Sequence, residues 1–415
     1  MEKPIFTKEM KKDYTILAPN MLPVHFKLIS RIFRAYGYKT ELLSTTGKEI
    51  SDTGLKYVHN DTCYPALLVI GQLISALQSG KYDVHKTALL ITQTGGGCRA
   101  SNYISLLRKA LDKADLGFVP VISLNFAGTE KSPGFKITPM MFIKLVSAVL
   151  YGDLLMTLKN QTQPYEKEPG STIALVDFWA EKLVNDMQSP KFFSRKNTLR
   201  NYKTIIENFA NLDRYDTKKM RVGIVGEIYV KFAPLGNNNL EDFLLSENCE
   251  VVMSGLLDFC MYCVYNMLAD RTYYGDGSKF KNRIIRAVFK YLLNRQKDII
   301  NSIKTYSDFT APSDFRHVIS LTDGYISTAT KMGEGWLLTA EMLELIDSGV
   351  NNIICAQPFG CLPNHICGRG MMKLIKDKHP DVNLVAIDYD PGATKVNQEN
   401  RIKLMLSIGR EQMVS

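Results

Sequence analysis

Short apolar runs alternate with longer amphipathic stretches along the first third of the chain, and this alternation most constrains the fold. Residues 14–18 have the pattern of a buried strand, and residues 25–36 have a helical periodicity that ends at Gly37. The same order then repeats, with strands predicted at 40–43, 87–92 and 119–124 and helices at 65–77 and 101–114. Strands that alternate with helices favour a parallel sheet with right-handed crossovers. We therefore expect an N-terminal α/β domain over residues 1–137.

The pattern changes after residue 138 and returns near residue 219. Long periodic stretches such as 141–158 and 172–187 predict a helical segment over residues 138–218. A C-terminal α/β domain is predicted over residues 219–415, with strands at 221–226, 250–253, 352–356 and 383–388 and helices at 240–245, 335–346 and 395–406. The fold class is therefore α/β, with two Rossmann-like parallel-sheet domains. Ligands of open α/β sheets bind at the carboxyl ends of the strands, so we expect the site in the interdomain cleft.

The composition of the chain is that of an intracellular enzyme. Its 415 residues are 45% hydrophobic, which is enough to bury the cores of two or three domains. No run of about 18 apolar residues predicts a membrane span, and the first 12 residues lack the apolar centre of a signal peptide. We expect a cytoplasmic protein that contacts neither membrane nor nucleic acid. The net charge of +9 is spread along the chain and weakly favours an anionic ligand such as a nucleotide or CoA.

Three cysteines stand beside glycine or proline at predicted strand-to-helix loops. They are Cys63 in NDTCYP, Cys98 in GGGCR and Cys361 in PFGCLPNH. A thiolate at a helix N-terminus is stabilised by free backbone N–H groups, so we expect a lowered pKa and metal ligation. A reducing compartment disfavours disulfides, and the wide spacing differs from that of zinc ribbons and ferredoxins. The pattern indicates an iron–sulfur cluster held by loops from both domains.

Other residues near these cysteines are candidates for binding and proton transfer. Three thiolates leave the fourth iron of a cubane open to a substrate. The run Gly95, Gly96 and Gly97 lets backbone N–H groups approach the cluster, although a phosphate cradle is an alternative interpretation. Glu227, after the strand 222–225, and His365 are the candidate catalytic acids or bases, and a surface histidine is the structural alternative for His365.

Six segments, in order, resemble the 2-hydroxyacyl-CoA dehydratase and double-cubane-cluster superfamily. They are NDTCYPALLVIGQ (60–72), QTGGGCRASNYI (93–104), GEIYVKFAPLGNNNLEDFL (226–244), GEGWLLTAEM (333–342), QPFGCLPNHICGRGM (357–371) and AIDYDPGATKVNQENRIKLML (386–406). The chain is most similar to the activase-related branch. The resemblance implies that Cys63, Cys98 and Cys361 hold the cluster. It also implies a homodimer and a partner, an ATP-hydrolysing activase that carries its own 4Fe-4S cluster.

The remaining cysteines decide between one cubane and two. A double cubane requires about six thiolates, whereas a single cubane requires three or four. Cys263 is the fourth candidate, because relatives of this branch carry cysteine there. Cys260, on the same predicted helical face, and Cys367, close to Cys361, would raise the number to six. The sequence leaves both a 4Fe-4S cluster and an 8Fe-9S double cubane open. Two further cysteines in apolar strands, Cys249 and Cys355, are predicted to be core residues.

Two classes of function are consistent with these features. The first is a redox enzyme component, charged by the activase, that reduces a small molecule or dehydrates a 2-hydroxyacyl-CoA by radical chemistry. The alternative is a non-catalytic electron-relay or scaffold subunit related to activase fusions. A site sealed by Tyr64, Phe359 and Leu362 would favour the relay. A zinc-bound structural protein is a third interpretation, which metal analysis would separate from the other two.

Overall fold

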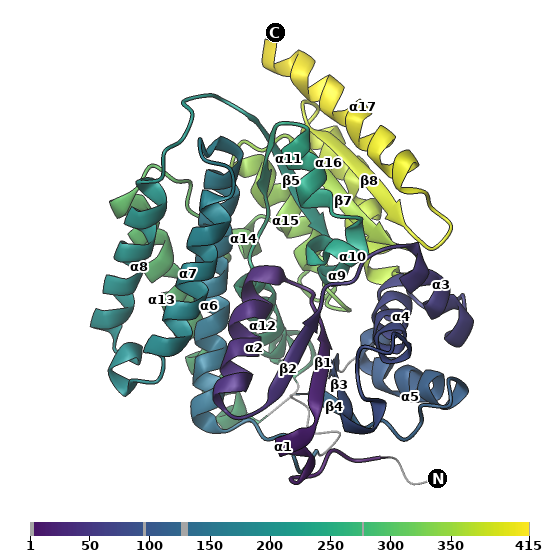
Figure 1. Cartoon of the computed structure of the whole chain (residues 1–415). Helices are drawn as coiled ribbons and strands as arrows, with labels where there is room; N and C mark the ends of the chain where they lie inside the picture. The colour runs from purple at the N-terminus through teal and green to yellow at the C-terminus, as the bar shows by residue number, and fades with distance from the viewer. Residues whose placement is uncertain (1–3, 94–96, 126–131, 276–277, 415) are drawn as a thin grey trace.

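The computed structural model describes residues 4–93, 97–125, 132–275 and 278–414 (Figure 1). Within these ranges the chain forms two parallel sheets of four strands each. The first sheet has the order β2-β1-β3-β4 and the second has the order β6-β5-β7-β8. We call each sheet with its flanking helices a lobe. The predicted α/β class is confirmed, and the two sheets agree with two Rossmann-like units.

All eight predicted strands are present within one to three residues of their expected ends. The strands are β1 (Thr15–Pro19), β2 (Lys39–Leu43), β3 (Thr87–Gln93), β4 (Val121–Asn125), β5 (Met220–Gly226), β6 (Cys249–Val252), β7 (Asn352–Pro358) and β8 (Asn383–Tyr389). Every residue of β7 is buried, and the first five residues of β3 are buried as well. These strands are near-continuous apolar runs because helices cover both faces of a parallel sheet.

The helices account for most of the remaining chain. They are α1 (Met10–Asp13), α2 (Pro23–Ala35), α3 (Lys48–Tyr57), α4 (Tyr64–Gln78), α5 (Tyr103–Lys113), α6 (Pro139–Thr162), α7 (Ser171–Asp186), α8 (Arg195–Ala210), α9 (Ile228–Phe232), α10 (Pro234–Asn237), α11 (Leu240–Ser246), α12 (Leu256–Tyr274), α13 (Lys279–Tyr306), α14 (Phe315–Ser320), α15 (Trp336–Asp347), α16 (Met372–Lys378) and α17 (Lys395–Val414). The predicted helical segment corresponds to α6, α7 and α8, which lie beside the first sheet in Figure 1.

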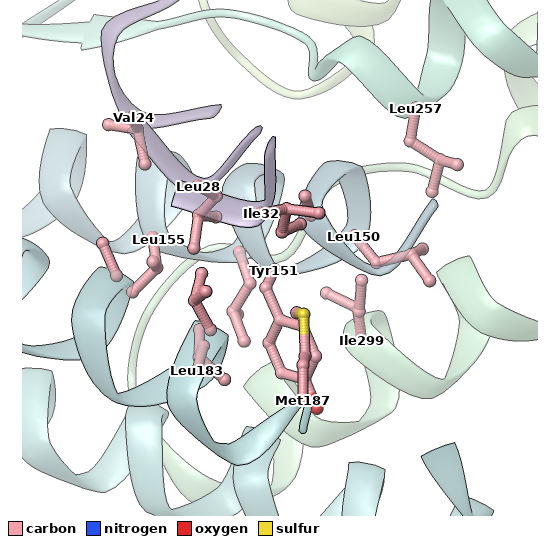
Figure 2. Close-up of a cluster of buried hydrophobic side chains, with 14 of the residues drawn as sticks. Val24, Leu28, Ile32, Leu150, Tyr151, Leu155, Leu183, Met187, Leu257 and Ile299 are labelled. Carbon is pink, nitrogen blue, oxygen red and sulfur yellow. The ribbon is translucent and has the colours of Figure 1, made fainter. Parts of the chain in front are cut away.

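The helices beside the first lobe share one apolar core. In Figure 2, Leu28 and Ile32 of α2 lie close to Tyr151 and Leu155 of α6, with Leu183 of α7 beneath them. The helices α12 and α13 also contribute to this core, although they follow residue 219 in the chain. The helical layer therefore combines residues from both sides of that expected boundary. The domain limits 1–137, 138–218 and 219–415 stay predictions.

One helix of the layer is as apolar as a membrane span. The segment Pro139–Tyr165, which contains α6, has a mean hydropathy of 1.6 over its most apolar 18 residues. Other parts of the fold bury 61% of that window. The apolar surface of α6 therefore packs against protein, as expected for the central helix of a bundle.

The helix α3 is an element that the sequence analysis missed. It packs against α4 at two glycines, where a side chain at Gly54 or Gly71 would collide with the backbone of the other helix. Because α3 lies between β2 and α4, Cys63 occupies a helix-to-helix loop. The expectation that it follows a strand directly is therefore wrong. Its place at the start of α4 is as predicted, since Cys63 is the residue before the first turn.

Candidate functional site

The loops of Cys63 and Cys361 touch through their backbones. The N–H of Tyr64, next to Cys63, donates to the carbonyl of Phe359 at 3.2 Å. Gly360 is also close to Cys63, because a Cβ at position 360 would lie 3.5 Å from the Cα of Cys63. The φ of Gly360 is +73°, a left-handed conformation that favours glycine. These contacts bring a loop of the first lobe against a loop of the second.

A second contact joins the two cysteine loops of the first lobe. The guanidinium of Arg99, next to Cys98, donates to the carbonyl of Asp61 at 2.7 Å. The hydroxyl of Tyr103, at the start of α5, lies 3.0 Å from the Sγ atom of Cys63. The sequence analysis did not identify Tyr103, whose only signal was its place in the segment 93–104. Either the hydroxyl or the thiol can be the donor of this hydrogen bond, and a thiolate at Cys63 would accept from the hydroxyl.

Each of the three cysteines has the backbone environment that the sequence predicted. Backbone N–H groups two or three residues further along the chain, at Ala66, Ala100 and Asn364, interact with the thiols of Cys63, Cys98 and Cys361 and lower their pKa values. These are the free N–H groups of the turns that follow each cysteine. Such groups stabilise a thiolate or hydrogen-bond to the sulfur of a bound thiolate.

The expected low thiol pKa is nevertheless wrong for the metal-free protein. Burial is the largest influence, and it raises the pKa of Cys63, Cys98 and Cys361 above the ordinary value. The side chains of Cys63 and Cys361 belong to residues that are only 7% and 9% exposed, and Cys98 is half-buried. The free energy lost when water is removed from a thiolate is larger than the stabilisation that the nearby N–H groups provide. The thiols therefore need a metal to lose their protons near neutral pH.

The contacts between the loops bring together the chain around three cysteines that lie 35 and 263 positions apart in the sequence. In accord with these contacts, a charge on Cys63 would raise the pKa of Cys98, and a charge on Cys98 would raise the pKa of Cys361.

Two carboxyl groups face the same thiols. Glu227 follows β5 and accepts a hydrogen bond from the N–H of Val230 at 2.9 Å, and Glu334 accepts one from the N–H of Ile228 at 3.0 Å. Burial, and then the neighbouring charge of Glu334, raises the pKa of Glu227 to about 8. Burial also raises the pKa of Glu334. A charge on either carboxyl raises the pKa of Cys98 and Cys361, so the carboxyl pair adjoins the thiols.

The imidazole of His365 is held by its own loop. Its Nδ1 atom is 2.9 Å from the carbonyl of Cys361, and its Nε2 atom is 2.8 Å from the side-chain amide of Gln357. With Nδ1–H as donor, Nε2 accepts from the amide, and both ring nitrogens are satisfied. His365 is exposed and holds the backbone of the third loop. This contact supports a positioning role for His365 next to the predicted ligand.

The glycine run is only partly described. Gly95 and Gly96 lie outside the described residues, so the expectation for them stays a prediction. Gly97 is exposed, and a Cβ at this position would collide with the side chain of Met332. Gly97 therefore packs closely against the loop that carries Glu334.

The additional cysteines form a second group beside Glu334. Burial, and then the charge of Glu334, raises the pKa of Cys367 after β7 to about 11, and the charge of Glu334 also raises the pKa of Cys263 on α12. Cys260 lies one turn before Cys263, and a charge on Cys263 raises its pKa further. Cys263 is exposed, Cys260 is half-buried and Cys367 is buried. The number of ligands beyond three stays open.

The remaining cysteines and the apolar neighbours of the site are plainly placed. Cys249 and Cys355 are 1% and 0% exposed within β6 and β7, in accord with the predicted packing role. Tyr64 is buried, whereas Phe359 and Leu362 are exposed to solvent. The last two side chains therefore do not seal the loops by packing into them.

Among the described residues, no three His, Cys, Asp or Glu side chains are placed to bind one metal ion. The cluster expected from the sequence stays a prediction.

Comparisons with known proteins add no relative. No protein-family model matches the chain, and a search of curated proteins finds no similar sequence.

Proposed function

We propose that Cys63, Cys98 and Cys361 hold an iron–sulfur cluster between the two lobes. The chain would then be a redox enzyme component of the 2-hydroxyacyl-CoA dehydratase and double-cubane type, charged by an ATP-hydrolysing activase. The observation that carries the proposal is the backbone contact between the loops of Cys63 and Cys361, which belong to different sheets. Packing alone gives no reason for three cysteines at three touching turns.

The residues around the thiols have definite tasks in this proposal. When bound, the cluster supplies one electron at low potential for reduction of a small molecule or dehydration of a 2-hydroxyacyl-CoA. The Tyr103 hydroxyl donates a hydrogen bond to Cys63, and His365 fixes the carbonyl of Cys361. Both contacts hold a thiol-bearing loop in place.

Glu227 and Glu334 share the handling of a proton. Burial and the charge of Glu334 disfavour ionisation of Glu227, and burial and the charge of Glu341 disfavour ionisation of Glu334. A pKa of about 8 keeps a proton on Glu227 near neutral pH. A carboxyl group protonated at working pH can give that proton to a nearby substrate and take it back. Glu227 is therefore the proposed general acid of the site, with Glu334 as the group that raises its pKa.

Anaerobic purification followed by metal and sulfide analysis tests the cofactor. We expect about four iron atoms per chain for a single cubane and about eight for a double one, with matching acid-labile sulfide. Zinc in place of iron, without sulfide, would contradict the proposal. Low-temperature EPR after reduction should show a paramagnetic cluster signal.

A second experiment separates an enzyme from an electron relay. The cluster is first reduced with an activase and ATP, and its absorbance is then followed after addition of a 2-hydroxyacyl-CoA or of small reducible molecules. Substrate-dependent reoxidation with product formation supports an enzyme. Stable reduction in the presence of every compound supports the relay. The Glu227→Gln variant should lose turnover while its iron content stays unchanged.

A further inference from the structure

The first half of α13 presents an apolar stripe to solvent. Four large side chains at helical spacing, Phe280, Ile284, Val288 and Tyr291, belong to residues that are 75%, 50%, 44% and 51% exposed. They lie at positions i, i+4, i+8 and i+11, so they fall on one face of the helix. Scattered exposed apolar residues need no explanation, but a continuous row on one helix marks an interaction surface.

The stripe is separate from the contacts that hold α13 in the fold. In the range 279–291 the residues that are not exposed are Asn282, Ile285 and Phe289, which face the protein. The second half of α13 is buried at positions such as Ile299 and Ile303, which belong to the core shared with α8 and α6. The first half is therefore attached along one narrow edge, and the stripe turns away from that edge.

Unpaired positive charges border the stripe. The same segment carries five basic residues and no acidic one: Lys279, Lys281, Arg283, Arg286 and Lys290. No ion pair between any of them and a described residue is present. All five are exposed. Helical spacing places Lys281 on one side of the stripe and the other four on the opposite side.

Two exposed aromatic residues stand at the end of α12, the helix that precedes α13. They are Tyr273 and Tyr274, which are 49% and 65% exposed. A hydrogen bond of 2.8 Å joins the hydroxyl of Tyr273 to that of Thr328. Lys331, beside the ring of Tyr274, forms an ion pair with Asp270. These contacts hold the two exposed rings on the body of the protein.

We propose that this face of α13, with Tyr273 and Tyr274 of α12, binds the surface of an anionic lipid bilayer. An apolar stripe flanked by lysine and arginine is the pattern of a helix that lies in the membrane interface. Each basic residue near such a surface contributes favourably, and lysine serves as well as arginine. Protein interfaces are depleted in lysine, and the aliphatic side chains Ile284 and Val288 have no counterpart to contact on a nucleic acid backbone.

The proposal changes one expectation from the sequence. We expected no membrane contact because no run of about 18 apolar residues predicts a membrane span. Peripheral binding needs neither, since it uses one face of a helix that is already folded. The binding surface is independent of the proposed cluster, and each can be tested without the other.

Co-sedimentation of the full chain with lipid vesicles tests the proposal. We expect binding to phosphatidylcholine vesicles that contain phosphatidylglycerol, weak binding to pure phosphatidylcholine, and loss of binding at high salt. The Lys279→Glu/Lys281→Glu variant should lower the partition coefficient about tenfold or more. The matched control is Lys373→Glu/Lys376→Glu, which changes two exposed lysines on α16 and should bind like the wild type.

Apolar variants test whether the stripe enters the lipid. Phe280→Ser/Ile284→Ser should lower binding strongly, whereas Phe178→Ser, at an exposed position on α7, should not. In the Phe280→Trp variant, the indole emission should shift to the blue when anionic vesicles are added. Circular dichroism confirms that each variant is folded. Absence of binding to anionic vesicles overturns the proposal, and so does binding that the double serine variant retains.

Discussion

The two lobes have the same strand order, yet they present their cysteines differently. In each sheet the third strand along the chain pairs with the first, and a cysteine follows it, Cys98 after β3 and Cys361 after β7. The chain after the second strand leads to Cys63 in the first lobe and to Cys263 in the second. Cys63 is buried, whereas Cys263 is exposed. Equivalent connections of a repeated scaffold thus carry two buried thiols, one half-buried thiol and one exposed thiol.

The difference arises from the segment that connects the second strand to its cysteine. In the first lobe α3 intervenes, and its close packing on α4 at Gly54 and Gly71 turns the Cys63 loop toward Phe359. In the second lobe α12 begins three residues after β6, and Cys263 lies two turns inside that helix. A thiol inside a helix has no free backbone N–H groups beside it. This is a physical reason to rank Cys263 below the other three as a ligand.

The largest expected effect is loss of iron after removal of the cysteine that follows the third strand of either lobe. Cys98→Ala and Cys361→Ala should each remove most of the iron from the anaerobically purified protein, because each deletes one of the three proposed ligands. Iron analysis and EPR provide the measurement. The matched control is Cys249→Ala, which changes a buried cysteine of β6 and should keep its iron. Iron content equal to the wild type in either loop variant would refute the ligand assignment.

A large loss of stability is expected at the first helix of the second lobe. Lys231 on α9 forms an ion pair with Glu341 at 2.8 Å, and both residues are buried. The corresponding helix of the first lobe, α2, has His25 beside Asp153 at 2.7 Å. Lys231→Met should lower the free energy of unfolding by about 3–5 kcal/mol, because it leaves Glu341 buried without its partner.

Chemical denaturation measures this loss. Lys48→Met, which breaks an exposed pair with Asp52, should cost less than about 1 kcal/mol. The double variant Lys231→Met/Glu341→Leu should recover part of the loss, since neither charge then remains buried. Equal destabilisation by Lys231→Met and Lys48→Met would contradict the buried ion pair between Lys231 and Glu341.

A smaller loss of stability is expected at the contact between α3 and α4, where the first lobe differs most from the second. Gly71→Ala places a methyl group against the carbonyl of Ile50, so α3 and α4 must separate. We expect the free energy of unfolding to fall by about 1–3 kcal/mol. Ser75→Ala, on the same helix, should change it by less than about 0.5 kcal/mol. If the packing of α3 on α4 positions Cys63, the Gly71→Ala variant should also bind less iron. An unchanged iron content would show that this helix contact does not position the site.

The Cys263→Ala variant tests the cysteine that follows the second strand of the second lobe. The exposed thiol of Cys263 should contribute less to retention of the cluster than the thiols of Cys63, Cys98 and Cys361. We expect most of the iron to remain, with a changed EPR line shape if Cys263 is a ligand. Complete loss of iron would show that the exposed thiol is as necessary as the other three.

The last comparison concerns the acid that follows the first strand of the second lobe. The pKa of Glu227 is about 8 when folded and near 4.5 when unfolded, so the folded protein binds more protons between these values. The free energy of unfolding of the metal-free protein should therefore fall as the pH rises from about 5 to 8. Glu227→Gln removes this titration and should flatten the profile. A slope that the variant leaves unchanged would contradict the raised pKa.

Much of the scaffold could be predicted from sequence, because apolar strands and amphipathic helices are local patterns. All eight strands were predicted, and so were the three cysteine loops that meet. The helices α12 and α13 were missed, because α13 carries apolar residues on two faces, one toward the core and one toward solvent. Such a helix shows no single clear stripe.

Properties that depend on burial could not be predicted in this way. The backbone N–H groups beside the cysteines were expected from the helix starts, and they are present. The predicted direction of the thiol pKa shift was wrong, because the direction depends on how far water is excluded, and that exclusion arises only when both lobes meet. The raised pKa of Glu227 could not be predicted either, because Glu334, which contributes to it, lies about a hundred residues away.

The measurement that most directly tests the account is anomalous diffraction at the iron absorption edge from crystals grown without oxygen. The account predicts an iron peak between the two lobes, bordered by the sulfur atoms of Cys63, Cys98 and Cys361. An absence of iron there in protein that contains iron, or a peak remote from these three residues, would contradict it.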